Sequence, residues 1–281
     1  MNIKYYLSFL ISLWCFHAFS QESGGFVGGG GGTGIRVQDQ YLLLDIWQFD
    51  PSYKINPSMK AVEPFVVEDY ETTGVISVPI FDLNKSVVKT LSIPMFSDSA
   101  QQDLNQRLQK SSAFDLAKKR INRYGLVLSL PSAMLTNLKF YFTNAEPETQ
   151  LRYYTIEKDI DVSTVAYYFF AKRSQSLVKR QVVISAPRWN KLDVTNQPAL
   201  IVHEALRDYQ QFISVGQKDK EFSEKILQQA TAIITLCDHS LYLEDYLLRL
   251  LSAYNGSLGG EEGLGEGFNL SKAWNECKRK L

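Results

Sequence analysis

The sequence predicts an α+β protein in which a β-rich N-terminal and central part packs against a helical C-terminal third. Two observations lead to this prediction. Short runs of β-branched and aromatic residues, separated by turn residues, recur before residue 186, and aromatic residues make up 12% of the chain. From residue 195 onward, apolar residues recur instead with the period of an α-helix.

Residues 1–20 have the layout of a secretory signal peptide. Lys4 supplies a positive charge, residues 5–16 form a short apolar core, and Ala18 and Ser20 are the small residues expected before a cleavage site. This core is too short to span a bilayer, and no later apolar run approaches ~18 residues. We therefore expect an exported protein, periplasmic or extracellular, without a transmembrane segment in its mature chain.

The charge balance limits the partners of the mature chain. Removal of the signal segment takes away Lys4 and no acidic residue, which leaves 29 basic and 30 acidic side chains. The chain has no basic patch dense enough for binding driven by phosphate groups, so we expect no nucleic-acid partner. No cofactor is expected either. The sequence does not identify a partner, and an envelope protein that contacts the aromatic-rich β region is one candidate.

Behind the signal segment, residues 21–34 are rich in glycine and predict a flexible leader. A phosphate-binding loop would need a Gly-Lys-Ser/Thr sequence and a following helix, and neither is present. Residues 35–281 are then predicted to form a single α+β domain, with a division into 35–125 and 126–281 as the alternative.

The strands are predicted from runs of β-forming residues. The expected segments, in chain order, are 41–47 (a strand or short buried segment), a hairpin of 75–78 and 87–91 around the turn-like residues 82–85, and then 126–130, 138–143, 164–170 and 181–186.

The helices are predicted from apolar residues spaced three and four apart. One helical region, 98–124, separates the two sets of strands and stops at Gly125. The expected C-terminal helices, in chain order, are 195–213 with Thr195 as its N-cap, 219–237, 240–254, and a short terminal helix containing Trp274 and Cys277.

The helix predicted at 195–213 carries an incomplete metal-binding motif. An H-E-x-x-H sequence on a helix places two imidazoles one turn apart, so that both reach one zinc ion, with the glutamate as general base. His203 and Glu204 match this motif, but Arg207 stands in place of the second histidine. A guanidinium has no lone pair to give to a metal. The segment therefore resembles the motif of zincin metalloproteases with one ligand missing.

Helical geometry separates this motif from the apolar stripe of its helix. His203 lies roughly 120° from the centre of the stripe, and Glu204 and Arg207 lie roughly 140° and 160° from it. We expect a half-buried His203 that hydrogen-bonds a nearby loop. Glu204 and Arg207 should be solvated, as a pair worth ~0.2–0.5 kcal/mol, unless another layer of the protein covers their face.

A metal-dependent hydrolase is the alternative interpretation, and it needs replacement ligands. Glu224 lies 20 residues after Glu204 on the next predicted helix, and His239 lies just beyond the end of that helix. A site of His203, Glu224 and His239 could hold zinc, with Glu204 as the catalytic base. If the same surface instead binds a partner without catalysis, Arg207 would pair with a carboxylate.

Two cysteines follow the signal segment, Cys237 and Cys277. Export would carry them to an oxidising compartment, which favours a disulfide over two free buried thiols. The bond would close a loop of about 40 residues and stabilise the fold by roughly 4 kcal/mol in the chain-entropy model.

The sequence around His203 also resembles a group of uncharacterised exported proteins of predatory and related Gram-negative bacteria. The likeness rests on a strand at 182–184, a turn around Trp189, the helical sequence NQPALIVHEALR at 196–207, and the start LLLD at 42–45. It covers about residues 24–47 and 150–235. A Tyr or Arg commonly stands in that group where zincins have their second histidine. The resemblance implies that Arg207 is a family feature, and it implies no activity. The leading interpretation is an exported, non-catalytic protein of the envelope or the medium.

Overall fold

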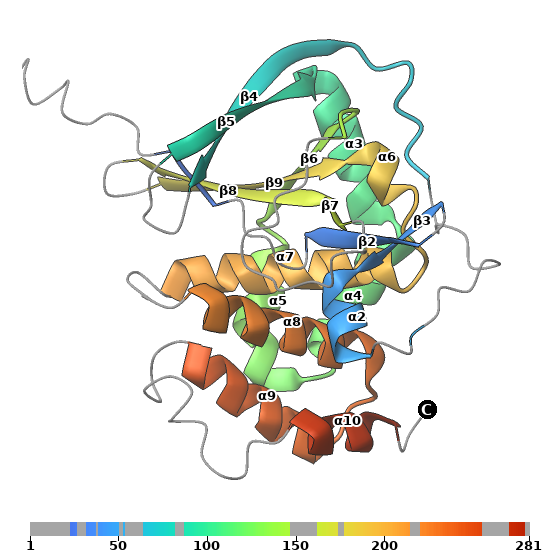
Figure 1. Ribbon diagram of the computed structural model, residues 1–281, viewed down its shortest axis with the longest axis vertical. Helices are drawn as coiled ribbons and strands as arrows, with labels where there is room; N and C mark the ends of the chain where they lie inside the picture. Colours follow the sequence, from blue (N-terminus) through green and yellow to red (C-terminus); the bar gives the residue numbers. More distant parts are fainter. Residues whose placement is uncertain are drawn as a thin grey trace, which may run out of the picture.

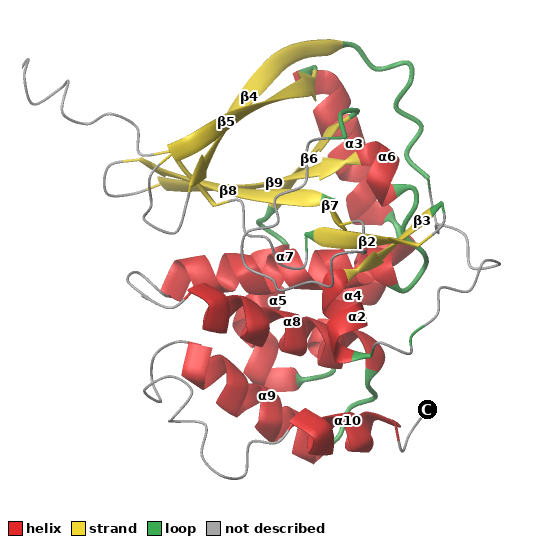
Figure 2. Cartoon of the chain, in the orientation of Figure 1, coloured by secondary structure: helices red, strands yellow, loops and turns green. Residues whose placement is uncertain are grey.

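The structure is a computed structural model that describes residues 23–26, 32–37, 39–50, 53, 64–81, 87–146, 162–173, 177–213, 220–254 and 270–278. The predicted signal segment lies outside these residues. The fold is α+β, as the sequence predicts: the strands lie before residue 186 and the helices dominate after it. In Figure 1 the strands form the upper part of the molecule and the C-terminal helices the lower part, and Figure 2 shows the same division by type of element.

The largest sheet has four strands in the order β1-β8-β9-β6. Their bounds are Ser23–Phe26 for β1, Ala166–Arg173 for β8, Leu177–Ser185 for β9 and Lys139–Thr143 for β6. β1, β8 and β9 are antiparallel neighbours, whereas β6 is parallel to β9. The predicted strands at 138–143, 164–170 and 181–186 are thus confirmed within one sheet.

A second sheet has three antiparallel strands in the order β3-β2-β7, with bounds Gln40–Leu43, Thr33–Val37 and Val162–Thr164. Only Val165 separates β7 from β8 along the chain. The two sheets therefore share a continuous stretch of chain. The N-terminal segment, which is residues 23–26, 32–37 and 39–49, pairs with both parts of this stretch. The segment at 41–47, expected as a strand or a short buried segment, divides between β3 and the short helix α2 (Leu44–Phe49).

The prediction of a flexible glycine-rich leader at 21–34 is wrong for the described residues. Ser23–Phe26 form β1, where Gly24 and Gly25 pair with Phe170 and Phe169. The Gly32 carbonyl accepts hydrogen bonds from the amides of Val165 and Ala166. A Cβ atom on Gly32 would lie 2.5 Å from the Ala166 carbonyl oxygen. Glycine is needed here for close approach between backbones rather than for flexibility.

A separate two-stranded sheet confirms the predicted hairpin, with β4 at Thr72–Phe81 and β5 at Val87–Phe96. The predicted turn at 82–85 lies outside the described residues. In Figure 1 this hairpin arches over the four-stranded sheet. Ile93 and Met95 of β5 pack on Tyr167 and Val183 of that sheet and form a small apolar cluster of their own.

The helical region predicted at 98–124 consists of two helices, α3 (Asp98–Lys110) and α4 (Ser112–Asn122). Ser111 separates them because its side chain accepts from the amide of Phe114 and donates to the carbonyl of Leu108. Side-chain hydrogen bonds of this kind take the place of the backbone hydrogen bonds that would continue a single helix through Ser111. On α3, the Gln101 side chain bonds the backbone of Phe142, so α3 covers the free edge of β6.

The strand predicted at 126–130 is wrong. This run forms a 3-10 turn (Gly125–Leu128) and the helix α5 (Ser129–Leu135). Gly125 has a φ of +50°, which turns the chain sharply after α4. A short apolar run does not by itself distinguish a strand from a buried helical segment, and here packing against α4 and α7 decides for the helix.

The helix α7 (Asn196–Ile213) lies at the centre of the molecule. It packs against α4, α5 and α8 (Lys220–Leu236) and also contacts the strands β3 and β8. The remaining elements are the short helix α6 (Ala186–Trp189), α9 (Leu241–Tyr254) and α10 (Leu270–Lys278). The main apolar cluster contains side chains from Tyr41 through Cys277, so residues before and after position 125 share it.

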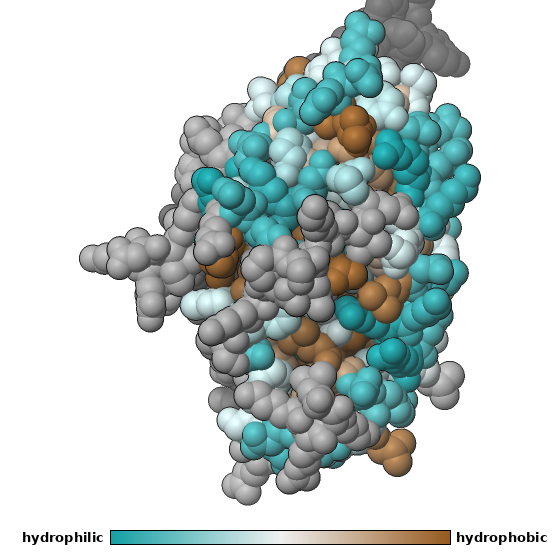
Figure 3. Space-filling view, turned by 90° about the vertical axis from the view of Figure 1, so that its right-hand side faces the viewer, coloured by the Kyte–Doolittle hydropathy of each residue, from teal (hydrophilic) through white to brown (hydrophobic). Residues whose placement is uncertain are grey.

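The surface contrasts with the interior around α7. Figure 3 shows the right-hand face of Figure 1, where hydrophilic side chains predominate and apolar ones gather near the middle. Charged side chains are ordinary on such a surface. On α7, by comparison, several charged and polar side chains lie inside the protein, and this makes the helix the candidate functional site.

Candidate functional site

The polar side chains of α7 form one buried face. On a helical wheel they fall within an arc of roughly 140°, opposite the apolar stripe that includes Val202, Ala205 and Leu206. The members of this face, all between 0 and 2% exposed, are Asn196, Gln197, His203, Glu204, Arg207 and Asp208. We call this set the α7 polar face. The condition attached to the sequence prediction is therefore met, because another layer of the protein covers the side of the helix expected to face solvent.

His203 bonds a carboxylate from the N-terminal part of the chain. Its Nδ1 lies 2.7 Å from Oδ2 of Asp45, and neither side chain is exposed at all. Against an ionised carboxylate, which can only accept, Nδ1 of His203 would be the donor of this hydrogen bond. The expectation of a half-buried His203 bonded to a loop is wrong: the partner lies on the short helix α2, which packs against α8.

Asp45 was not predicted as a site residue. It directly follows three leucines, and an acidic residue at the end of such an apolar run is a signal of a buried partner. The identity of that partner could not be read from the sequence, because 158 positions separate Asp45 from His203.

Glu204 lies against the glycine segment. A Cβ atom on Gly32 would be 3.2 Å from Oε1 of Glu204, so the two residues are in direct contact. The Gly32 carbonyl in turn accepts from the amides of Val165 and Ala166. Glu204 is fully buried and Arg207 is 2% exposed, so the exception attached to the sequence prediction, a covering layer, applies to this pair. The N-terminal segment covers this part of the α7 polar face.

The start of α7 is joined to the same segment. The Asp193 carboxylate accepts from the amides of Thr195 and Asn196, and the Asp193 carbonyl accepts from Gln197. Asp193 is therefore the N-cap, in place of the predicted Thr195. Asn196 in turn accepts from the amide of Leu43, at 2.9 Å. The sequence signal for this cap was an aspartate shortly before the first apolar residues of the helix.

The candidate metal ligands do not share one environment. His239 is exposed by 37% and its Nε2 lies 2.9 Å from Oε2 of Glu244, whereas His203 is buried on Asp45. Glu224 belongs to α8, and its side chain lies outside the described part of the structure. Within that part, no group of three or more His, Cys, Asp or Glu side chains is arranged to hold a metal ion.

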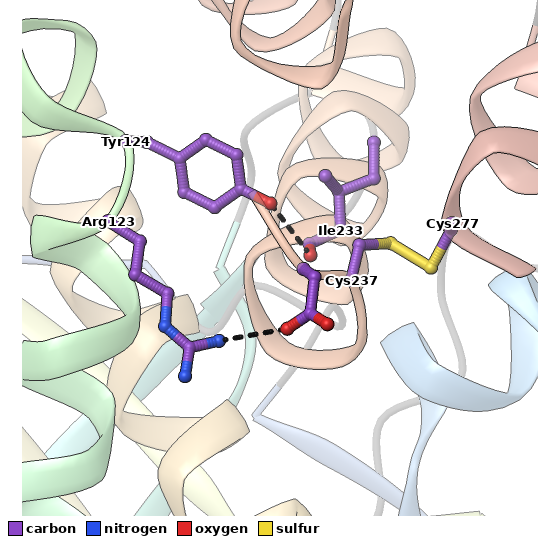
Figure 4. Close-up of polar contacts among 6 residues, drawn as sticks. Arg123, Tyr124, Ile233, Cys237 and Cys277 are labelled. Atoms are coloured by element: carbon purple, nitrogen blue, oxygen red, sulfur yellow. Dashed lines mark hydrogen bonds and ion pairs between the residues drawn. A yellow bond between two sulfur atoms is a disulfide. The ribbon is translucent and has the colours of Figure 1, made fainter. Parts of the chain in front are cut away.

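The predicted disulfide between Cys237 and Cys277 is present. It joins the residue after α8 to α10 across 40 positions of the chain. Figure 4 shows the bond beside Arg123 and Tyr124 from the end of α4. The Tyr124 hydroxyl donates to the carbonyl of Ile233, and burial raises the pKa of this phenol above its usual value. Both sulfur atoms belong to buried residues, so the bond is part of the core of the helical layer.

The chemistry open to the α7 polar face follows from these contacts. Because Nδ1 of His203 contacts Asp45, any proton transfer or ion contact of this imidazole would have to use its other ring nitrogen, Nε2. A carboxylate on one ring nitrogen is also the usual support of a metal-binding histidine. The buried charges at Asp45, Glu204, Arg207 and Asp208 raise the cost of removing any one of them, because a partner left alone would be an uncompensated buried charge.

Comparisons with protein-family models, with curated proteins and with solved structures found no match for this chain. Among the residues described, no helix is long and apolar enough to cross a membrane.

Proposed function

We propose that this is an exported, non-catalytic protein of the envelope or the extracellular medium, in which the His203–Glu204 helix is a structural centre. The observation that carries the proposal is the complete burial of His203 on Asp45. A catalytic side chain must reach its substrate, and the two residues of the motif are instead covered by the N-terminal segment.

The N-terminal segment contacts the α7 polar face at several points. Asp45, Leu43 and Gly32 all belong to the first part of the chain, and they contact His203, Asn196 and Glu204 in that order. The α7 polar face thus joins the N-terminal segment to the helices. Buried polar networks of this kind specify one arrangement of the chain more than they add to its stability.

Export is proposed from the signal-like residues 1–20, with the disulfide as a feature typical of an oxidising compartment. Membership of the exported protein group that shares the NQPALIVHEALR pattern is part of the same proposal. Fractionation of producing cells tests it. We expect a mature chain without residues 1–20 in the periplasm or medium; a full-length chain confined to the cytoplasm would contradict export.

A metal-dependent hydrolase is the second candidate, and one observation favours it: the Asp45–His203 contact is the support that a zinc-bound histidine commonly has. In this case Nε2 of His203 would bind zinc, Glu204 would be the general base, and Glu224 and His239 would be further ligands.

Metal analysis of the purified mature protein separates the two candidates. We expect no stoichiometric zinc in the wild-type protein, in His203→Ala or in His239→Ala, which removes the other histidine of the candidate ligand set. Near-stoichiometric zinc that disappears in His203→Ala would overturn the leading proposal and support the hydrolase.

A further inference from the structure

The outer edge of the β4–β5 hairpin is uncovered. In the described part of the chain, β4 pairs with β5 and with no other strand. β1 also contacts β4, but its backbone pairs with β8. Figure 1 shows β5 between β4 and the four-stranded sheet, with β4 at the margin of the molecule. α3 covers the edge of β6, whereas residues 72–75 of β4 are all exposed. An uncovered edge offers backbone hydrogen-bonding groups to another chain.

Two prolines show which backbone groups of β4 point to this edge. Antiparallel strands alternate between residue pairs that exchange hydrogen bonds and pairs that do not. Pro94 of β5 pairs with Val75. Pro79 of β4 pairs with Thr90, an even number of positions along the strand and with no register shift in between, so both pairs belong to the same class. Proline has no N–H to give, and this class is therefore the one without hydrogen bonds. The N–H and C=O groups of Val75, and those of Ser77 in the same class, point away from β5.

A contact on the other side of the hairpin agrees with this direction. The Thr143 hydroxyl of β6 donates to the Pro94 carbonyl at 2.6 Å, so this carbonyl of β5 faces β6 rather than β4. The side chains of β4 alternate as well: Ile76 packs on the small apolar cluster beneath the hairpin, and Val75 is 63% exposed. The edge therefore presents both backbone groups and an apolar side chain to solvent.

Exposed acidic side chains lie where this edge begins. They come just before β4 and at the start of α3, which follows β5, and they are Glu68, Asp69, Glu71 and Asp98. The amide of Ser97 donates to the carbonyl of Glu71, which holds the two groups at the same end of the hairpin. A strand that pairs along Val75 passes this acidic end, and basic side chains complement it.

We propose that the outer edge of β4 binds an extended basic peptide, which adds to the hairpin as a third strand. In this mode of recognition, backbone hydrogen bonds supply the affinity and alternate side chains supply the specificity. Val75 and Ser77 form the hydrogen bonds, and the acidic end pairs with the basic residues of the peptide. Pro79, which has no donor, and the register shift between Thr72 and Gly74 limit the pairing to a short stretch. The site is separate from the α7 polar face, so its test does not depend on the structural role proposed for that face.

Fluorescence anisotropy with labelled synthetic peptides tests the proposal on the mature protein. The probe alternates lysine and valine. One control alternates glutamate and valine, and the other is the lysine–valine peptide with methylated backbone nitrogens, which cannot donate to a strand. We expect saturable binding of the probe, with affinities lower by roughly tenfold or more for both controls. No binding of the probe, or equal binding of the methylated peptide, would overturn the proposal.

Variants then assign the binding to β4. Val75→Pro removes an N–H that points outward, so it should weaken the affinity by roughly tenfold or more while the pairing with β5 is kept. Val75→Thr keeps this N–H and the branched side chain, and it should bind like the wild type. Undiminished binding by Val75→Pro would contradict a site at this edge. The methylated peptide tests the same hydrogen bonds from the side of the ligand and requires no change in the protein.

The acidic end is tested by a matched pair of variants. Glu71→Gln should weaken the binding of the probe at low salt, and the difference should shrink as salt is added. Asp115→Asn removes an exposed carboxylate of α4 and should leave the affinity unchanged. Equal effects of the two variants would contradict a contribution of the acidic end.

Sedimentation of the protein without peptide tests for another occupant of the edge. We expect the wild type and Val75→Pro to sediment alike. A wild-type dimer that Val75→Pro dissociates would assign the edge to a second copy of the chain and overturn the proposal of a basic peptide.

Discussion

The two histidines among the described residues both contact a carboxylate, but in very different surroundings. His203 and Asp45 are sealed inside the protein, whereas His239 and Glu244 lie at the surface. In water an ion pair gains little, because solvent already stabilises both groups. In the interior, the loss of one partner leaves the other buried and uncompensated. Burial, not the type of residue, decides which histidine the fold depends on.

The largest expected effect is on the buried histidine. His203→Ala should lower the free energy of unfolding by roughly 3–5 kcal/mol, because Asp45 would be left as a buried charge without its donor. His239→Ala should change it by about 0–1 kcal/mol. Urea denaturation of both variants measures the difference, and equal losses would show that burial does not separate the two sites.

The disulfide is expected to come next. Replacing Cys237 and Cys277 together by serine should lower the free energy of unfolding by roughly 2–4 kcal/mol, mainly because the unfolded chain gains freedom. The comparison is made by denaturation under non-reducing conditions. Unchanged stability of the double variant would mean that the helical layer does not need this link.

Two glycines test the tight covering of Glu204. Gly32→Ala should destabilise by about 1–3 kcal/mol, because the new Cβ would overlap the Ala166 carbonyl oxygen. At Gly74 nothing lies within 4 Å of a new Cβ, so Gly74→Ala should be neutral or stabilise by up to ~1 kcal/mol. The melting temperatures of the two variants, each compared with the wild type, measure these effects. A tolerated Gly32→Ala would restore the idea of a flexible leader.

The smallest effect is expected at the start of α7. Asp193→Ala removes the acceptor of two helix amides and should cost about 0.5–2 kcal/mol, more than Thr195→Val at the N-cap that the sequence predicted. Denaturation curves of the two variants compare them directly. A larger loss for Thr195→Val would favour Thr195 as the cap.

The local pattern of the chain predicted most elements. Period and turn residues located the hairpin, the later strands and the helices α7 to α10, because each depends on residues close in sequence. The apolar run at 126–130 was misread because strands and buried helical turns share such runs, and packing against α4 and α7 decides between them.

The sequence predicted the residues of the candidate site but not their surroundings. The motif residues His203, Glu204 and Arg207 could be found from their spacing, and so could the position of their face on the helix. Its burial could not, because the covering residues Gly32 and Asp45 are distant in sequence. Glycine-rich composition favours flexibility as a rule, and the close approach at Gly32 is visible only once the strands are in place.

The central claim is that Asp45 and His203 stabilise the fold through each other and without a metal. A double-mutant cycle of Asp45→Asn, His203→Asn and the double variant, unfolded in urea with a chelator present, measures this coupling. We expect a coupling energy of about 1–3 kcal/mol that is the same with and without the chelator. A coupling near zero, or one that vanishes when metal is removed, would contradict the account.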